Sequence, residues 1–170
     1  MTTSSNDARA ARLERMPIVL APDAILDLMI DGAGPARRHA AVALFEAIAA
    51  DVESGKDERP VYIASITVPI IFHHARRSGP GGFGLARDVI RDLLCLCRVA
   101  DLRNEDYLKA LQFRKYELED ALQFVTCRKV NARFLVTRRR FGGVKRAPVF
   151  RRTAGEMLAL FRRHATMSVV

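Results

Sequence analysis

Short apolar runs that alternate with stretches of helical periodicity place the strongest limit on the fold of this chain. The sequence predicts a pair of helices after each of the first three runs, a loop between the fourth and the fifth run, and one more helix after the last run. Short buried strands alternating with helices are typical of a parallel sheet covered by helices on both faces. We therefore expect an α/β fold with a short, mostly parallel central sheet. The predicted strands are Pro17–Leu20, Val61–Ala64, Arg98–Ala100, Arg133–Thr137 and Val149–Phe150.

Local signals set the ends of several predicted helices. Pro22 stands at a favoured first helical position, and Ser65 and Asn104 are predicted N-caps. Thr153 and Glu156 have the spacing of a capping box. The predicted helices span about Pro22–Asp31, Pro35–Glu53, from Ser65 to about Arg77, Phe83–Cys97, Asn104–Phe113, Glu117–Val130 and Ala154–Arg163.

The length of 170 residues predicts a single domain. We expect this domain at residues 16–165, between an N-terminal tail at 1–15 and a C-terminal tail at 166–170. The apolar runs are too short to cross a membrane, and the start lacks the apolar core of a signal peptide. Cys95, Cys97 and Cys127 lack the spacing of a zinc site and are predicted to be buried. These features favour a cytoplasmic protein without a membrane partner.

The net charge of +9 and the pI near 10.2 favour polyanionic partners, above all nucleic acid. A basic surface that docks an acidic protein is the alternative. The clearest concentration of charge surrounds Gly142–Gly143, where arginines are suited to bidentate phosphate binding and Phe141 to stacking on a base. A solvated loop is again the alternative. The candidate nucleic-acid-binding residues are Arg138, Arg139, Arg140, Lys145 and Arg146.

Carboxylates gather where one predicted helix begins. Glu117, Glu119 and Asp120 lie at the start of the helix that precedes the fourth strand, and Asp23 follows the first strand. Carboxylate oxygens are the preferred ligands of hard cations. Acidic residues in a first helical turn are also favoured by the helix dipole. The pattern is therefore compatible with a cation site, with helix stabilisation, or with both.

The order and spacing of four segments resemble the PIN-domain family and, within it, the VapC-like bacterial toxins. The resemblance covers about Pro17–Phe161. It implies a three-layer α/β/α sandwich and a ribonuclease that uses Mg²⁺ or Mn²⁺. It also implies an antitoxin-like protein partner and a homodimer. The matching segments are Ile18–Leu28, Glu119–Phe124, Phe134–Arg138, and Ala147–Phe150 followed by Thr153–Leu160.

The resemblance also implies where the metal-binding acids should lie, and most of those positions lack a carboxylate. Asp120 matches a family acid, whereas Ala21, Pro69 and Gly142 stand at the other three. Arg139 occupies a further position that is usually polar and uncharged. The remaining candidates for catalysis and for metal binding are Asp120, Asp23 and Glu117, with Glu119 beside them and His73 or His74 as substitute ligands.

Three functions follow as hypotheses from this departure. The first is a catalytically impaired or inactive PIN-like protein that binds RNA or a protein. The second is an active Mg²⁺- or Mn²⁺-dependent endoribonuclease with a rearranged site. The third is a dimeric interaction module without a role on nucleic acid.

Overall fold

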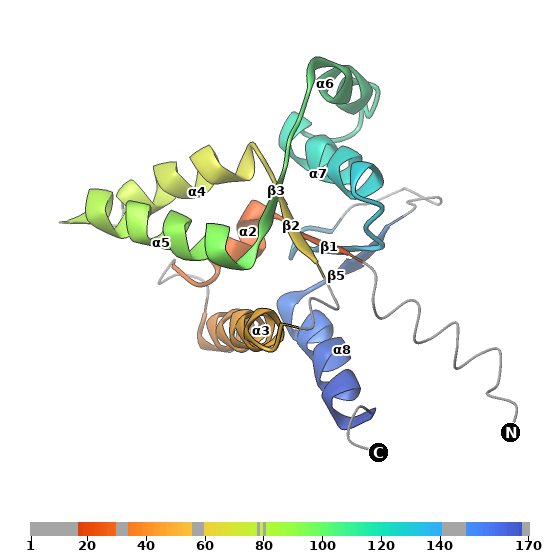
Figure 1. Ribbon diagram of the computed structural model, residues 1–170. Helices are drawn as coiled ribbons and strands as arrows, with labels where there is room; N and C mark the ends of the chain where they lie inside the picture. Colours follow the sequence, from red (N-terminus) through yellow and green to blue (C-terminus); the bar gives the residue numbers. More distant parts are fainter. Residues whose placement is uncertain are drawn as a thin grey trace, which may run out of the picture.

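Five parallel strands form the centre of the molecule in the computed structural model (Figure 1). The structure describes residues 17–29, 34–55, 60–77, 79, 81–140 and 149–167, without the side chains of 163–167. The sheet order is β3-β2-β1-β4-β5, and every neighbouring pair is parallel. This confirms the expected parallel α/β sheet. The strands are β1 Ile18–Leu20, β2 Val61–Ala64, β3 Arg98–Ala100, β4 Phe134–Val136 and β5 Phe150–Arg152.

Side chains of the central strand alternate between two hydrophobic clusters. Ile18 and Leu20 belong to one cluster, and Val19 and Ala21 belong to the other. Because successive side chains of a strand point to opposite faces, the sheet is buried on both sides. This burial explains why the strands read as continuous apolar runs rather than as alternating ones.

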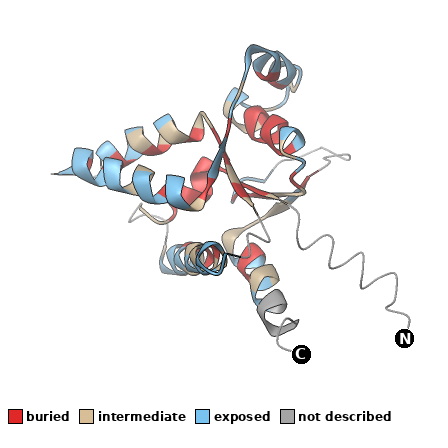
Figure 2. Ribbon diagram, viewed as in Figure 1, coloured by how far each residue is buried: buried red, intermediate tan, exposed pale blue. Residues whose placement is uncertain are grey.

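Helices cover both faces of the sheet, so the fold has three layers (Figure 1). Helix α7 packs on β1, β2 and β4, and α6 packs on α7. Figure 2 shows that burial is concentrated in the inner strands β1, β2 and β4 and in α7, while α5 is exposed along most of its length. The α7 layer holds α6 Asn104–Leu111 and α7 Leu118–Lys129; the opposite layer holds α2 Pro22–Leu26, α3 Pro35–Glu53, α4 Thr67–Arg76, α5 Gly82–Leu96 and α8 Ala154–Met167.

The predicted caps had mixed outcomes. The capping box of α8 is confirmed, since the Thr153 N–H donates to Glu156 Oε2 at 2.7 Å, and this bond lowers the pKa of Glu156. The predicted cap at Ser65 is wrong, because its hydroxyl accepts a bond from Leu102 N–H, 37 residues away. Asn104 is not a cap either: it is the first residue of α6, and the Arg103 N–H donates to Asp106 instead.

Several element boundaries also differ from the sequence prediction, and two of the differences have a clear physical cause. Helix α2 ends at Leu26, because bonds from Leu28 N–H to Ile25 O and from Met29 N–H to Leu26 O tighten the chain into turns. The rest of that predicted helix, residues 30–31, lies outside the described residues. Strand β5 runs to Arg152, because parallel pairing with β4 continues through its two arginines.

The cysteines are not all buried, which corrects another prediction. Cys95 is exposed on α5, whereas Cys97 and Cys127 are buried. Burial raises the pKa of Cys97 to about 12 and also raises the pKa of Cys127. Both buried thiols therefore stay protonated at neutral pH. No described helix combines the length and the apolar character needed to span a membrane.

The sheet order reverses between β1 and β4. From β1 the chain moves outward to β2 and then β3, and it returns to the other side of β1 to form β4 and β5. Such a reversal opens a crevice beyond the carboxyl ends of the two central strands. The residues that follow β1 and β4 meet at this crevice, and the candidate site is built there.

Candidate functional site

Asp23 is the buried centre of the site. It lies just after β1 and is 8% exposed. The Thr137 hydroxyl lies 3.0 and 2.9 Å from its two carboxylate oxygens, and the Arg138 N–H donates to Oδ2 at 2.9 Å. Both donors follow β4. The carboxylate therefore joins α2 to the end of β4, and its oxygens already have partners from the protein.

A second carboxylate, Asp27, lies one helical turn after Asp23 and binds the same loop. A guanidinium NH of Arg138 donates to Asp27 Oδ1 at 2.8 Å. Burial raises the pKa of Asp27, and the Arg138 charge opposes this shift. Asp27 was not among the site residues predicted from the sequence. Its spacing of four residues from Asp23, on the same side of a helix, was the available signal.

Arg139 holds the third carboxylate of the site. One of its terminal NH groups lies 2.9 Å from both Oδ1 and Oδ2 of Asp120. The hydrogen bond to Asp120 raises the pKa of Arg139, and the charges of Asp120, Glu119 and Asp23 raise it further. A fixed cation of the protein itself therefore lies among three carboxylates from α2 and α7. We call Asp23, Asp27, Asp120, Arg138 and Arg139 the arginine–carboxylate cluster.

The donors of this cluster do not fit Mg²⁺ or Mn²⁺. Such ions need several carboxylate, carbonyl or water oxygens that converge on one point, but the oxygens of Asp23 and Asp120 are engaged by the protein. No group of three or more His, Cys, Asp or Glu residues in the described parts of the chain is arranged to hold a metal. Glu117 is the N-cap of α7, and its side chain makes no cap hydrogen bond. His73 lies on α4, 3.2 Å from Arg77.

The candidate nucleic-acid-binding arginines divide into two kinds. Arg138 and Arg139 are directed to carboxylates, while Arg140 is exposed and has no hydrogen bond or ion pair within the described residues. A guanidinium NH of Arg151 on β5 lies 3.3 Å from the carbonyl oxygens of both Arg138 and Arg139. This contact helps to fix the segment that follows β4. The other expected contacts lie outside the described residues, namely Lys145, Arg146, Phe141 and Gly142–Gly143.

Comparison with solved structures places this architecture among known folds. VapC20 of Mycobacterium tuberculosis, a toxin that cleaves the sarcin-ricin loop, matches with a TM-score of 0.52 and 18% identity, over 69% of this chain and 86% of its own. A chain of VapBC2 from Rickettsia felis, bound to a DNA fragment from their promoter, matches with a TM-score of 0.56 and 12% identity, over 81% and 98%. The chain has the PIN-domain fold of the VapC toxins. No protein-family model and no curated protein matches the sequence.

Within the described parts of the chain, two buried polar side chains have no hydrogen-bond partner. Gln123 of α7 is 1% exposed, and neither its amide nitrogen nor its amide oxygen has a partner. It lies three residues after Asp120, on the same side of the helix. The Thr67 hydroxyl, at the start of α4, is also buried without a partner. Unpaired buried polar groups are costly and rare in folded proteins. The sequence signal was a lone glutamine within the apolar stretch of α7.

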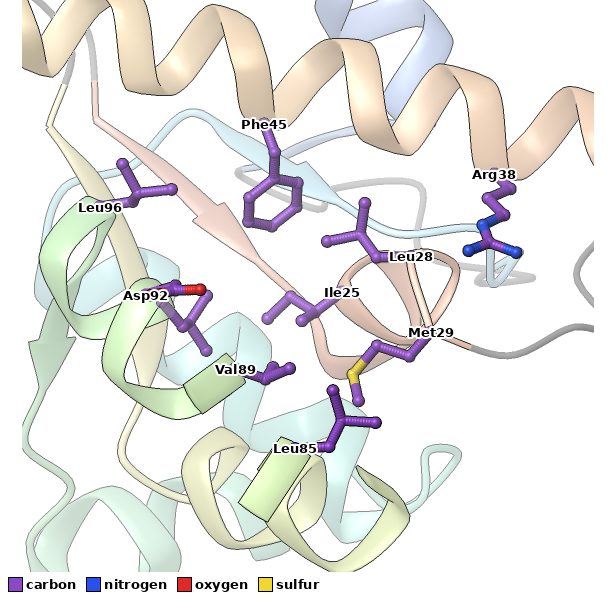
Figure 3. A pocket seen from close by; sticks show the side chains of 10 residues that line it. Ile25, Leu28, Met29, Arg38, Phe45, Leu85, Val89, Asp92 and Leu96 are labelled. Atoms are coloured by element: carbon purple, nitrogen blue, oxygen red, sulfur yellow. The ribbon is translucent and has the colours of Figure 1, made fainter. Parts of the chain in front are cut away.

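An apolar hollow lies between α2, α3 and α5 of the PIN fold (Figure 3). Its volume is about 350 Å³. Figure 3 shows side chains from the three elements directed toward one another, with Arg38 and Asp92 as the charged members of the lining. The apolar members are Ile25, Leu28, Met29, Phe45, Leu85, Val89, Leu93 and Leu96. The hollow is therefore mainly apolar, with two charged residues in its lining.

Proposed function

We propose that this protein is a cytoplasmic PIN-fold RNA-binding protein that does not cut RNA by a metal-dependent route. The observation behind the proposal is the contact of Arg139 with Asp120, beside the contacts of Arg138 and Thr137 with Asp23 and Asp27. In this arrangement the carboxylates stabilise the fold and hold two arginines in place.

Electrostatics explains why a divalent cation is disfavoured in the arginine–carboxylate cluster. Two unit charges 4 Å apart in a protein environment interact by about 4 kcal/mol, so a divalent ion beside a guanidinium meets roughly twice that repulsion. Arg139 remains charged throughout the accessible pH range. A cation would therefore have to displace Arg139 before it could reach Asp120.

Charge and exposure support RNA as the ligand. The chain carries a net charge of +9, and Arg140 projects from the end of β4 without a carboxylate partner in the described structure. Phosphate contacts by lysine and arginine supply most of the affinity of sequence-independent nucleic-acid binding. VapC20, which has the same fold, is a toxin that cleaves the sarcin-ricin loop, so this fold presents an RNA-facing surface in at least one other protein.

Binding to a fluorescein-labelled single-stranded RNA, followed by anisotropy over a salt series, tests this proposal. We expect binding that weakens as salt rises, since counterions are released from the RNA. Arg140→Glu should weaken binding several-fold, because it replaces an exposed cation with an anion near the phosphates. Arg87→Glu makes the same charge change on exposed α5 and is the matched control.

The same RNA, incubated with Mn²⁺ or Mg²⁺, tests the second part of the proposal. We expect intact RNA with the wild-type protein and with Asp120→Ala. Cleavage that disappears in Asp120→Ala would instead identify an active metal-dependent endoribonuclease. If Arg140→Glu and Arg87→Glu weaken RNA binding equally, the segment after β4 is not a specific RNA contact.

A protein-binding function is the second candidate, and the apolar hollow between α2, α3 and α5 favours it. An antitoxin-like protein or a second copy of this chain could place an apolar side chain there. One chain matched by this fold comes from VapBC2, which is bound to a promoter DNA fragment. Light scattering on the wild type and on Leu85→Asp separates the two occupants. A dimeric mass lost in the variant assigns the hollow to a homodimer, and a monomer in both leaves a foreign partner.

A further inference from the structure

An exposed aromatic ring at the edge of the sheet is flanked by two arginines. Phe150 opens β5, the edge strand, and is 49% exposed. The guanidinium carbon of Arg133 lies 5.0 Å from the centre of the Phe150 ring, and that of Arg152 lies 6.0 Å from it. We call these three residues the Phe150 platform.

The core does not account for the position of this ring. Its register partner Phe134 is half-buried and packs against the main hydrophobic cluster, while Phe150 lies one strand further out. Their ring centres are 6.2 Å apart. Phe150 therefore lies beside Phe134 at the rim of the core and keeps about half of its surface open to solvent.

The two arginines of the platform are also available to a ligand. Arg133 has no carboxylate partner within the described part of the chain. Arg152 donates a hydrogen bond to the carbonyl oxygen of Arg151 at 3.2 Å, which leaves further guanidinium NH groups for other acceptors. A partly exposed aromatic ring beside cations is an arrangement that proteins use to bind single-stranded nucleic acids.

We infer that Phe150 stacks on a base of single-stranded RNA, while Arg133 and Arg152 contact the adjoining phosphates. This inference rests on the RNA binding proposed above and assigns a base-contacting residue to it. Stacking tolerates any base, because every base has a flat π face. The platform is therefore expected to bind single strands with little sequence preference and to reject duplexes, whose bases are already stacked.

The platform is connected to the arginine–carboxylate cluster. Arg151, next to Phe150 on β5, contacts the carbonyl oxygens of Arg138 and Arg139. Phe134, the register partner of Phe150, precedes Arg140 by six residues (140 − 134 = 6). That distance is at most about 20 Å of extended chain.

A tryptophan at position 150 reports on stacking directly, because the natural sequence contains no tryptophan. In Phe150→Trp, we expect a single-stranded RNA to quench the fluorescence at least twofold. Phe83→Trp is the matched control, since Phe83 is 57% exposed on α5, and its fluorescence should not change. An abasic oligonucleotide of equal charge should bind without quenching Phe150→Trp, and a duplex should also fail to quench it. A DNA strand of the same sequence should quench it as well.

Affinity provides the second readout. Loss of one stacked base corresponds to about 5- to 150-fold weaker binding, so Phe150→Leu should weaken RNA binding within that range and Phe150→Tyr should restore it. If RNA does not quench the fluorescence of Phe150→Trp and Phe150→Leu binds RNA with wild-type affinity, Phe150 does not stack on a base. That result would leave the proposed RNA binding itself intact. Absence of RNA binding by the wild-type protein would instead remove the proposed function itself.

Discussion

Replacing Asp23 with alanine is expected to lower the free energy of unfolding by about 2–4 kcal/mol, since each buried donor that loses its acceptor costs about 1–3 kcal/mol. The Thr137 hydroxyl and the Arg138 N–H both lose their acceptor, and Thr137 is 1% exposed. The contact also spans 114 residues between α2 and the end of β4. Its loss removes a link between the two halves of the sheet.

Urea unfolding followed by circular dichroism measures this change. Asp88→Ala is the control, because Asp88 forms an exposed pair with Arg91 on α5 and such pairs contribute at most about 1 kcal/mol. Asp23→Asn keeps an acceptor oxygen and should lose less stability than Asp23→Ala. If Asp23→Ala unfolds at the same urea concentration as Asp88→Ala, the carboxylate has no structural role.

Replacing Gln123 with leucine is expected to raise the free energy of unfolding by about 1–3 kcal/mol. The change removes two buried polar atoms that have no partner and keeps a similar side-chain volume in a packed site. Most substitutions of a buried residue destabilise a protein, so a gain at this position is a distinctive result.

The melting temperature and the urea midpoint of Gln123→Leu both test this prediction. Gln112→Leu makes the same substitution at an exposed position after α6, and surface changes of this kind usually fall within about 0.5 kcal/mol. A loss of stability in Gln123→Leu would mean that the amide is satisfied in solution. The Gln123 amide would then be a candidate polar contact of the crevice beside Asp120.

The sequence predicts the elements of this fold well where the signals are local. Helix α3 has the expected bounds, because Pro35 begins it and the alanine-rich stretch that follows favours a helix. The capping box of α8 is equally local, since its two side chains are three residues apart. Strand β2 also has its expected bounds, and its apolar run reflects burial on both faces of the sheet.

The site is less predictable because its contacts are long-range. The family resemblance singled out both Asp120 and Arg139, but 19 residues separate them, and only the fold shows that they share hydrogen bonds. The same reason explains the error at Ser65. Its hydroxyl accepts a hydrogen bond from the Leu102 N–H, which the pairing of β2 with β3 brings close. Asp27 was missed because the helix around it is short and the partner lies beyond β4.

The arginine–carboxylate cluster offers a physical basis for the proposal that this PIN fold binds RNA without cutting it. The carboxylates that remain hold Arg138 and Arg139 in place, and the loop thereby presents Arg140 to solvent. In this proposal the engaged acids are not available as ligands for a divalent cation, and Arg139 supplies a fixed positive charge beside Asp120.

Titration of the protein with Mn²⁺, followed by the electron paramagnetic resonance signal of the free ion, tests this account most directly. Asp120→Asn serves as the reference, because it keeps the side-chain size and removes the charge. The account predicts that the wild-type protein and Asp120→Asn leave the same concentration of free Mn²⁺ at every point of the titration. One equivalent of Mn²⁺ bound by the wild type and released in Asp120→Asn would contradict it.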